Sequence, residues 1–408
     1  MEDGLLPSSD WLSPASDVSS QCPVSPHEQV HTESKMVALA GYQQNVVVVG
    51  GGIVGASISW HLQAQGANVT VVAEDIGGTA TPNSFAWINA AYGNPKFYFD
   101  LRHRSMGHWR ELGGDGQLPD LPIHWGGSLS WDMPPEELET YLEQSASWGY
   151  DVIRVDNSEI SEREPAFEER ALPEWGWGVH ASEEGSVEPE QAARYFLSEA
   201  KARGAHVLEA EVTGFIKGES GRRISGVVMA SGDEVRADHV VLAAGFGSVA
   251  LLAAEGITLP VTEKEGLLIH TKPTRPLLNG ITYAKELHMR QTLDGRILAG
   301  VDEAGGDPGE DPQRTAEQLL AKVKEALKGT DDLELDYYTV GRRPTPADGY
   351  PILGDTGLEG LSLAVMHSGV SLAPVVGQLI SQLVLAGKAD PALADFSLAR
   401  FSNLTSAS

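Results

Sequence analysis

A chain of 408 residues exceeds the roughly 250 to 300 residues at which single hydrophobic cores stop growing, so we expect two domains. Its 57 acidic and 29 basic residues give a formal charge of -28, which repels phosphate backbones and makes nucleic acid an unsuitable partner. The single cysteine, Cys22, excludes an intramolecular disulfide framework and any Cys-rich zinc or iron–sulfur site held by this chain alone.

The first 40 residues differ in composition from the rest of the chain. Residues 1–40 are rich in Ser and Pro and show neither helical nor strand periodicity, so we expect a disordered tail. The chain has no run of 18 apolar residues, and its start lacks the basic and apolar regions of a secretory signal. We therefore expect a cytoplasmic protein without membrane insertion.

The pattern after the tail predicts a strand, a glycine turn, a helix and a second strand. Val46–Val49 are β-branched and apolar on both faces, which is typical of a buried strand in a parallel sheet. Residues 50–52 are glycines that break this strand. Ile53–Gln65 then fit a helix that Gly66 ends before a second strand at Asn68–Val72.

Later segments predict one more helix and several short strands. Pro189 opens an amphipathic helix that ends near Gly204. Strands are predicted at 206–208, 212–216, 224–229 and 239–242, and a hairpin is predicted from 287–292 to 296–299 through Asp294-Gly295. Parallel and antiparallel elements in one chain predict a mixed α/β (α+β) fold with two domains interleaved in sequence.

The predicted domain boundaries follow this mixture. A Rossmann-like nucleotide-binding domain with a parallel sheet is expected from residues 44–100, 151–260 and 337–400. A smaller substrate domain built on an antiparallel sheet is expected from residues 101–150 and 261–336.

The glycine turn carries a dinucleotide-binding fingerprint. Gly50, Gly52 and Gly55 have the G-x-G-x-x-G spacing directly after a strand and at the start of a helix. These glycines allow a tight turn, close approach to a pyrophosphate and close helix packing, and the helix N-terminus attracts the phosphates. Glu74 stands at the end of the second strand, where a carboxylate accepts hydrogen bonds from ribose hydroxyls.

From about residue 45 to 400 the chain resembles the FAD-dependent D-amino-acid oxidase superfamily, in particular its glycine-oxidase and sarcosine-oxidase-like branch. The resemblance rests on five blocks in order: Val46 to Glu74, Gly77 to Trp87, Gly185 to Pro189, Asp238 to Gly245, and the pair Gly341-Arg342-Arg343-Pro344 with His367-Ser368-Gly369.

The resemblance implies which residues bind FAD. They are Gly50, Gly52, Ile53, Val54, Gly55, Glu74, Thr79, Ala80, Ser84, Val212, Ala244, Gly245, Ser368, Gly369, Val370 and Leu372. Leu372-Ala373-Pro374 would begin a helix whose positive end faces the flavin. Relatives with covalent flavin attach it to a cysteine in the C-terminal third or to a histidine in the block that matches residues 87–90, and this chain has neither, so we expect noncovalent FAD.

The resemblance also implies a substrate-binding residue. Arg343 matches the family arginine that binds the substrate carboxylate, and its planar guanidinium suits a bidentate contact. Arg342 is the alternative, since only one of two neighbours on a strand points inward. His367 precedes the Ser-Gly at the flavin edge, but we assign no general base. Glu265 stands where many relatives carry an arginine or another residue, which leaves the substrate open.

The implied activity is oxidation of the C–N bond of an amino acid or N-methyl amino acid to an imine, by hydride transfer to flavin N5. The partners are then a small-molecule amine or amino acid and an electron acceptor, either oxygen, which gives hydrogen peroxide, or another carrier. Two alternatives stay open: a tailoring oxidase or N-demethylase of a larger amine, and a flavoprotein dehydrogenase subunit of a heteromer.

Overall fold

The computed structural model describes residues 43–90, 93–218, 221–301 and 306–402. The predicted tail at 1–40, which includes Cys22, lies outside the described residues.

A six-stranded sheet carries the first strand of the fold in its middle. Its order is β19-β20-β13-β1-β2-β9, and every neighbouring pair is parallel except β19 with β20. The strands are β1 (Asn45–Val49), β2 (Asn68–Ala73), β9 (His206–Glu209), β13 (His239–Leu242), β19 (Ile352–Asp355) and β20 (Leu361–Val365). The chain passes from β1 to β2 on one side and returns to β13 on the other. Ligands of open α/β sheets bind at such a reversal, beyond the carboxyl ends of the strands.

Helices cover this sheet and bury its apolar side chains. All four valines of β1 are buried, as expected for a strand that is covered on both faces. α2 (Ile53–Ala64) packs against α6 (Pro189–Ala202) and α9 (Gly369–Ala386), and α3 (Lys96–Leu112) packs against α9. The predicted strand–helix–strand unit and the helix that begins at Pro189 are therefore confirmed.

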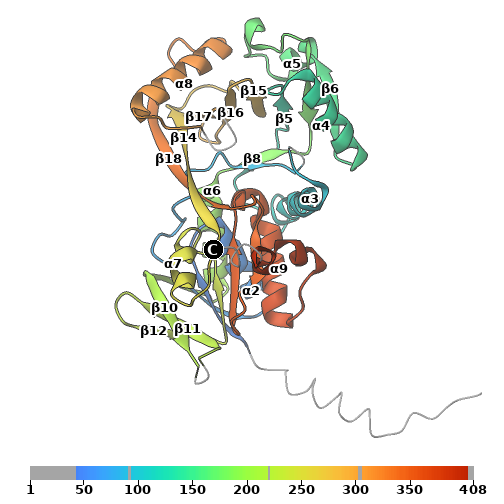
Figure 1. Ribbon diagram of the computed structural model, residues 1–408. Coiled ribbons are helices and arrows are strands. Elements are labelled where there is room, and N and C mark those ends of the chain that lie inside the picture. Colours follow the sequence, from blue (N-terminus) through green and yellow to red (C-terminus); the bar gives the residue numbers. More distant parts are fainter. Residues whose placement is uncertain (1–42, 91–92, 219–220, 302–305, 403–408) are drawn as a thin grey trace, which may run out of the picture. The chain divides into compact units, whose positions relative to one another are not determined.

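An eight-stranded sheet has the order β18-β14-β17-β16-β15-β5-β7-β6, and only β15 and β5 pair in parallel. Its strands are β5 (Ser128–Ser130), β6 (Val152–Asp156), β7 (Trp177–Ala181), β14 (Val261–Thr271), β15 (Ile281–Ala284), β16 (Leu287–Gln291), β17 (Ile297–Gly300) and β18 (Leu335–Pro346). The predicted hairpin is the antiparallel pair β16 and β17. Figure 1 shows β14 and β18 as a long ribbon that runs from this sheet toward α2 and α9.

Strand pairing divides the chain differently from the predicted domain boundaries. β6 and β7 belong to the eight-stranded sheet, although residues 151–260 are predicted for the nucleotide-binding domain. β18 pairs with β14 along its length, although residues 337–400 are also predicted for the nucleotide-binding domain. α3 packs on α9 although much of it falls within 101–150. The physical reason is that a short apolar pattern specifies a strand or helix but not its partner.

Two small antiparallel sheets and several helices complete the fold. One sheet has the order β10-β11-β12 and the other the order β3-β8-β4. Their strands are β3 (Trp87–Ile88), β4 (Ile123–His124), β8 (Gly185–Val187), β10 (Val212–Lys217), β11 (Ile224–Met229) and β12 (Glu234–Arg236). The remaining α-helices are α4 (Pro135–Ser147), α5 (Asn157–Arg163), α7 (Gly247–Ala253) and α8 (Pro312–Ala326), and the short 3₁₀ turns are η1 (Glu169–Ala171), η2 (Pro391–Phe396) and η3 (Leu398–Phe401).

Helix α9 begins at Gly369, earlier than the start predicted at Leu372. Pro374 therefore lies inside the helix, where it lacks the N–H that would bond to the carbonyl four residues earlier. That carbonyl, on Val370, instead accepts a 3.2 Å hydrogen bond from the indole N–H of Trp109 in α3. A side chain from a neighbouring helix thus satisfies the carbonyl that the proline leaves open.

Among the described helices, α9 is also the one that is long and apolar enough to cross a membrane. Two thirds of it is buried, 67%, by the rest of the chain. Because α9 packs against α2 and α3, its apolar composition is explained by its place in the core.

Candidate functional site

A cavity of about 1030 Å³ lies at the carboxyl ends of the central strands, next to the reversal beside β1. Small-molecule sites range from roughly 300 to 1,000 Å³, so this cavity suits a ligand as large as a dinucleotide. The predicted cofactor residues that line it are Gly50, Gly52, Ile53, Val54, Glu74, Thr79, Ala80, Ser84, Val212, Ala244, Gly245, Ser368, Gly369 and Val370. Gly55 and Leu372 lie behind the lining, in the buried parts of α2 and α9.

The first and third glycines of the turn are required by close packing. Gly50 has a φ of +117°, and a Cβ there would lie 2.3 Å from the carbonyl oxygen of Ala243. A Cβ on Gly55 would lie 2.1 Å from the carbonyl oxygen of Gly50. Any side chain at either position would push α2 away from β1 and β13, so these glycines hold the helix start against the sheet.

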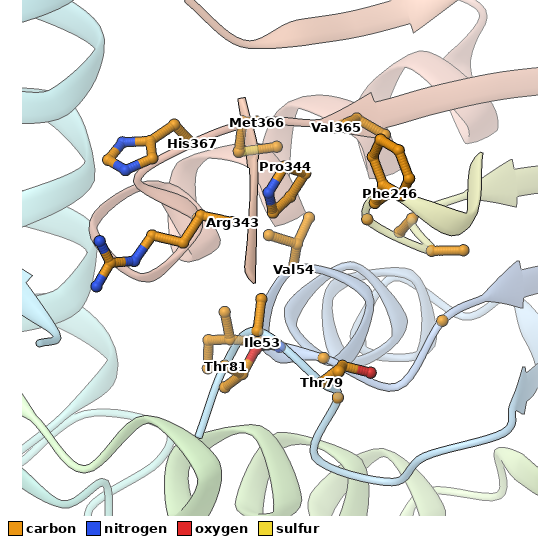
Figure 2. A pocket seen from close by; sticks show the side chains of 18 of the residues that line it. Ile53, Val54, Thr79, Thr81, Phe246, Arg343, Pro344, Val365, Met366 and His367 are labelled. Carbon is orange, nitrogen blue, oxygen red and sulfur yellow. Dashed lines mark hydrogen bonds between the residues drawn. The ribbon is translucent and has the colours of Figure 1, made fainter. Parts of the chain in front are cut away.

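The N-terminus of α2 faces the cavity, and its own N-cap residue supplies no side-chain cap. Its N-cap residue is Gly52, and the first turn has no acidic residue. The N–H of Ile53 donates a 3.1 Å hydrogen bond to Oγ1 of Thr81, and Figure 2 shows these two residues side by side. The helix start therefore offers a partial positive charge and backbone N–H groups other than that of Ile53, which is the arrangement that binds phosphate.

A second glycine loop packs closely against this turn. Gly78 has a φ of +78°, and a Cβ there would lie 2.6 Å from Cα of Gly52. The loop brings Thr79 and Thr81 to the cavity wall beside the helix start. The loop and the turn thus form one surface of backbone that side chains do not obstruct.

The two neighbouring arginines of β18 have different surroundings. Arg343 is 8% exposed, and its side chain lies on the same side of the cavity as His367 in Figure 2. Arg342 forms a 3.2 Å ion pair with Glu265 of β14, and both of these side chains are about half exposed. Successive residues of a strand point to opposite faces, so Arg343 is the buried member of the pair.

Cationic side chains surround His367. Burial, and then the nearby Arg343, Arg102 and Lys264, lower the pKa of His367 to about 4, so this imidazole is neutral at pH 7. Its Nδ1 lies 3.0 Å from Oγ of Ser368, which precedes α9 in the left-handed region with a φ of 56°. This end of the cavity is therefore electropositive, which favours an anionic ligand.

Aromatic rings form another part of the cavity wall. Trp87 of β3 and Tyr283 of β15 have ring centroids 4.2 Å apart, and Phe85 meets Tyr283 edge to face. Tyr283 also stacks on His288, with ring centroids 3.5 Å apart. These rings come from different sheets and give the wall an apolar surface that excludes water.

A fully buried carboxyl holds this aromatic wall. Glu184 accepts hydrogen bonds of 2.7 Å from the indole N–H of Trp87, 2.6 Å from Ser128 and 2.7 Å from the hydroxyl of Tyr150. Burial raises the pKa of Glu184 to about 7. Because Ser128 belongs to β5 and Trp87 to β3, Glu184 connects strands of two different sheets.

A comparison with protein families shows which family the chain belongs to. Residues 45–383 match the family described as FAD dependent oxidoreductase. This chain belongs to that family. As a FAD dependent oxidoreductase, the chain is an enzyme of the oxidase or dehydrogenase type, and the resemblance to the D-amino-acid oxidase superfamily is confirmed.

Relatives of the chain include two glycine oxidases and an opine oxidase subunit. It is 26% identical over 355 residues to glycine oxidase of Bacillus licheniformis, which covers 84% of this chain and 93% of the relative. It is 29% identical over 370 residues to glycine oxidase of Pseudomonas aeruginosa, with 84% and 94% covered. It is 25% identical over 382 residues to an opine oxidase subunit of Agrobacterium tumefaciens, with 88% and 98% covered.

Solved structures share the fold. Glycine oxidase from Bacillus cereus superposes with a TM-score of 0.76 at 20% identity, over 86% of this chain and 98% of that one. L-proline dehydrogenase from P. horikoshii superposes with a TM-score of 0.77 at 22% identity, over 88% and 98%. The expected mixed α/β architecture of a flavoprotein in this family is therefore confirmed.

The residues present fit FAD. Gly50, Gly52 and Gly78 bring backbone close together at the start of α2, because a Cβ on Gly50 or Gly78 would clash with neighbouring backbone. Glu74 follows β2 at the cavity wall and is exposed, as an acceptor for ribose hydroxyls must be. The cavity volume of about 1030 Å³ suits a ligand as large as a dinucleotide.

Sequence reasoning missed several residues of this site. Lys264 and Arg102 line the cavity, yet neither belongs to a recognisable motif. Glu184 lies within the buried part of the fold, directly before the Gly185 block. One sequence gives no signal for such a glutamate, because burial depends on tertiary contacts. Alternation along β14 does not mark Lys264 either, since residues 262–265 are all exposed.

Proposed function

We propose that this FAD dependent oxidoreductase oxidises the C–N bond of an amino acid or N-methyl amino acid to an imine. The observation that carries the proposal is the buried Arg343 in the electropositive end of the FAD-sized cavity. A buried guanidinium in a cavity wall is suited to a planar carboxylate, which it can bind through two parallel hydrogen bonds.

FAD would be held without a covalent bond. The backbone at Gly50 and Gly52 and the start of α2 would take the pyrophosphate, Glu74 the ribose, and Val212 the adenine. The start of α9 near Ser368 would face the flavin with its positive end. When bound, FAD supplies the acceptor for the hydride, and with it the two electrons, that leaves the substrate carbon next to nitrogen.

The protein would contribute position and electrostatics. Arg343 would fix the carboxylate, so that the carbon bearing the amine is held in one orientation. His367 is neutral at pH 7, so it adds no charge beside the bound amine and carboxylate. Trp87 and Tyr283 would exclude water from the reacting carbon, and the imine would be hydrolysed to an oxo acid and an amine after it leaves this wall.

Relatives support an amino-acid-like substrate, because those with known activities include glycine oxidases and an opine oxidase subunit. The last of these supports a second candidate, a flavoprotein subunit that works within a heteromer. A purified yellow protein that oxidises amino acids on its own would rule out this second candidate. We place the enzyme in the cytoplasm and propose oxygen as the acceptor, with hydrogen peroxide as the product, or another electron carrier in its place.

The experiment is anaerobic reduction of the flavin in the purified protein, followed by its absorbance. The panel is glycine, sarcosine, proline, D-amino acids and N-methyl amino acids, each beside the same amine without its carboxylate. Bleaching by one or more acids and not by their matched amines supports the proposal. Bleaching by larger amines alone would favour the tailoring oxidase. Peroxide formation in air then separates an oxidase from a dehydrogenase.

A further inference from the structure

Two cations face each other across the ribbon that borders the cavity. Lys264 of β14 and Arg343 of β18 are directly opposite in the antiparallel register. Both residues line the cavity, and both lower the pKa of His367 in its wall. Side chains in such a pair have Cβ atoms roughly 4.5 to 5.5 Å apart, and like charges there are destabilising.

The adjacent pair in the same ribbon shows the opposite arrangement. Arg342 lies opposite Glu265, and the two side chains form a 3.2 Å ion pair. Glu263, which also borders the cavity, shares its side of β14 with Glu265 because side chains alternate along a strand. Lys264 therefore lies opposite another cation, Arg343. Its neighbour Glu265, in contrast, lies opposite Arg342, whose positive charge neutralises the carboxylate.

A substrate with one carboxylate would place one negative charge against these two positive charges. A substrate with two carboxylates would match both of them. Arg343 is buried and Lys264 is exposed to solvent, so the first carboxylate would bind deep in the cavity and the second near its mouth. Lysine and arginine carry their charges on long side chains, so the pair can reach two carboxylates separated by about three bonded atoms.

We propose that the enzyme acts on an amine that carries two carboxylates, one bound by Arg343 and the other by Lys264. This inference rests on the proposed function, and it adds that Lys264 determines specificity. The oxidation is unchanged: the carbon next to nitrogen would give up a hydride, for which bound FAD would be the acceptor, and the nitrogen would give up a proton. Water then adds to the imine carbon, and the C–N bond breaks to leave an oxo acid and an amine.

Binding of unreactive acids to the FAD-loaded protein tests the pair of cations without the redox reaction. Glutarate has two carboxylates separated by three carbons, and butyrate is the matched acid with one. We expect glutarate to bind at least tenfold more tightly than butyrate, measured as the change in flavin absorbance during titration. In Lys264→Met this preference should fall about tenfold, and in Lys264→Arg most of it should remain. Lys272→Met is the control, because it removes a lysine that is paired with Glu334 on the surface.

Turnover gives the second readout. Wild type should show a kcat/KM for iminodiacetate at least tenfold above that for N-ethylglycine, and Lys264→Met should lose this ratio. Equal binding of glutarate and butyrate to wild type, or an unchanged preference in Lys264→Met, would overturn the inference. Failure of the proposed function has a different signature: wild type would oxidise no amino acid of any kind, while glutarate would still bind more tightly than butyrate through Lys264.

Discussion

The carbonyl oxygen of Ala243 lies 2.3 Å from the position that a Cβ atom on Gly50 would occupy. The end of β13 and the turn after β1 are therefore in contact through bare backbone. The same turn borders the cavity, so the packing that fixes the sheet also shapes the proposed pyrophosphate site. A change that separates these strands should therefore disturb both the packing of the sheet and the proposed pyrophosphate site.

Gly50→Ala should destabilise the fold and remove the flavin. A non-glycine residue in a strained backbone region costs roughly 1 to 3 kcal/mol, and the contact with Ala243 adds to this cost. The measurement is flavin absorbance per protein together with urea unfolding. Gly66→Ala is the control, since Gly66 also has a positive φ, +88°, but its Cβ would meet open space. This control should lose about 1 to 2 kcal/mol and keep its flavin. Equal flavin content in both variants would contradict the role of this turn.

Acid precipitation of the purified protein should leave the yellow flavin in the supernatant. The expectation follows from the sequence, in which the residues that match the covalent attachment sites of relatives are neither cysteine nor histidine. The measurement is the absorbance of supernatant and of pellet dissolved in denaturant. A yellow pellet would show a covalent bond, and mass spectrometry of its peptides would then identify the residue.

His367 should not contribute a step to the pH dependence of kcat/KM between pH 5.5 and 8. Its pKa is lowered to about 4 by burial and by the cations around it, so the imidazole stays neutral across this range. His367→Gln should therefore keep the shape of the wild-type profile, whatever its effect on the absolute rate. A step near pH 6.5 that is present in wild type and lost in the variant would show that His367 titrates normally.

Glu184 should make the stability of the protein depend on pH. Its folded pKa of about 7 lies above its ordinary value of 4.5, so its contribution is fully present below pH 4.5. Between pH 4.5 and 7 the unfolded chain has lost this proton and the folded chain keeps it, so stability falls as pH rises. The loss amounts to about 3 kcal/mol at most.

Glu184→Gln has no ionisable group at this position, so it should gain stability relative to wild type over the same pH range. Urea unfolding of both proteins at pH 5 and pH 7.5 measures the difference directly, because every other titrating group is common to the two. A difference in free energy of unfolding that does not change with pH would mean that Glu184 ionises with its ordinary pKa. Weaker binding of substrate by the variant would indicate that Glu184 positions Trp87.

Local patterns in the sequence predicted the elements that they specify. The valines of β1, the glycines of the turn and the hairpin at Asp294-Gly295 each define a backbone conformation within a few residues, so strands and helix appear where expected. Which strands pair with each other did not follow from these local patterns. No strand was predicted at β6 or β7, and their place in the eight-stranded sheet depends on β5, which follows from packing of the whole chain.

The residues of the site fall into the same two groups, those that a local motif marks and those that only tertiary contacts bring together. Motif residues at the turn and at Ser368 were accessible to sequence reasoning, because each motif is continuous in the chain. Lys264 opposite Arg343, and Glu184 against Trp87, are pairs of residues far apart in sequence. One sequence does not contain the register of β14 on β18, so the doubly positive pair becomes visible only in the folded chain.

Arg343, which is buried, and Arg342, which is exposed, are neighbours on β18 and allow a matched test of carboxylate binding. Arg343→Leu should lower kcat/KM for an amino acid about 10- to 150-fold, because a hydrogen bond to a charged group contributes roughly 1.5 to 3 kcal/mol. Arg343→Lys should recover part of this loss, since an ammonium lacks the planar fork. Arg342→Leu removes an ion pair at the surface and should change kcat/KM by less than about fivefold. Flavin content should be the same in all three variants.

The most direct test is the ratio of kcat/KM for an amino acid to that for the same amine without its carboxylate, measured in wild type and in Arg343→Leu. We predict a ratio of about 10 to 150 in wild type, and a ratio close to one in the variant. A variant that retains the wild-type ratio would contradict carboxylate recognition by Arg343, and the larger-amine oxidase would then be the better account of this enzyme.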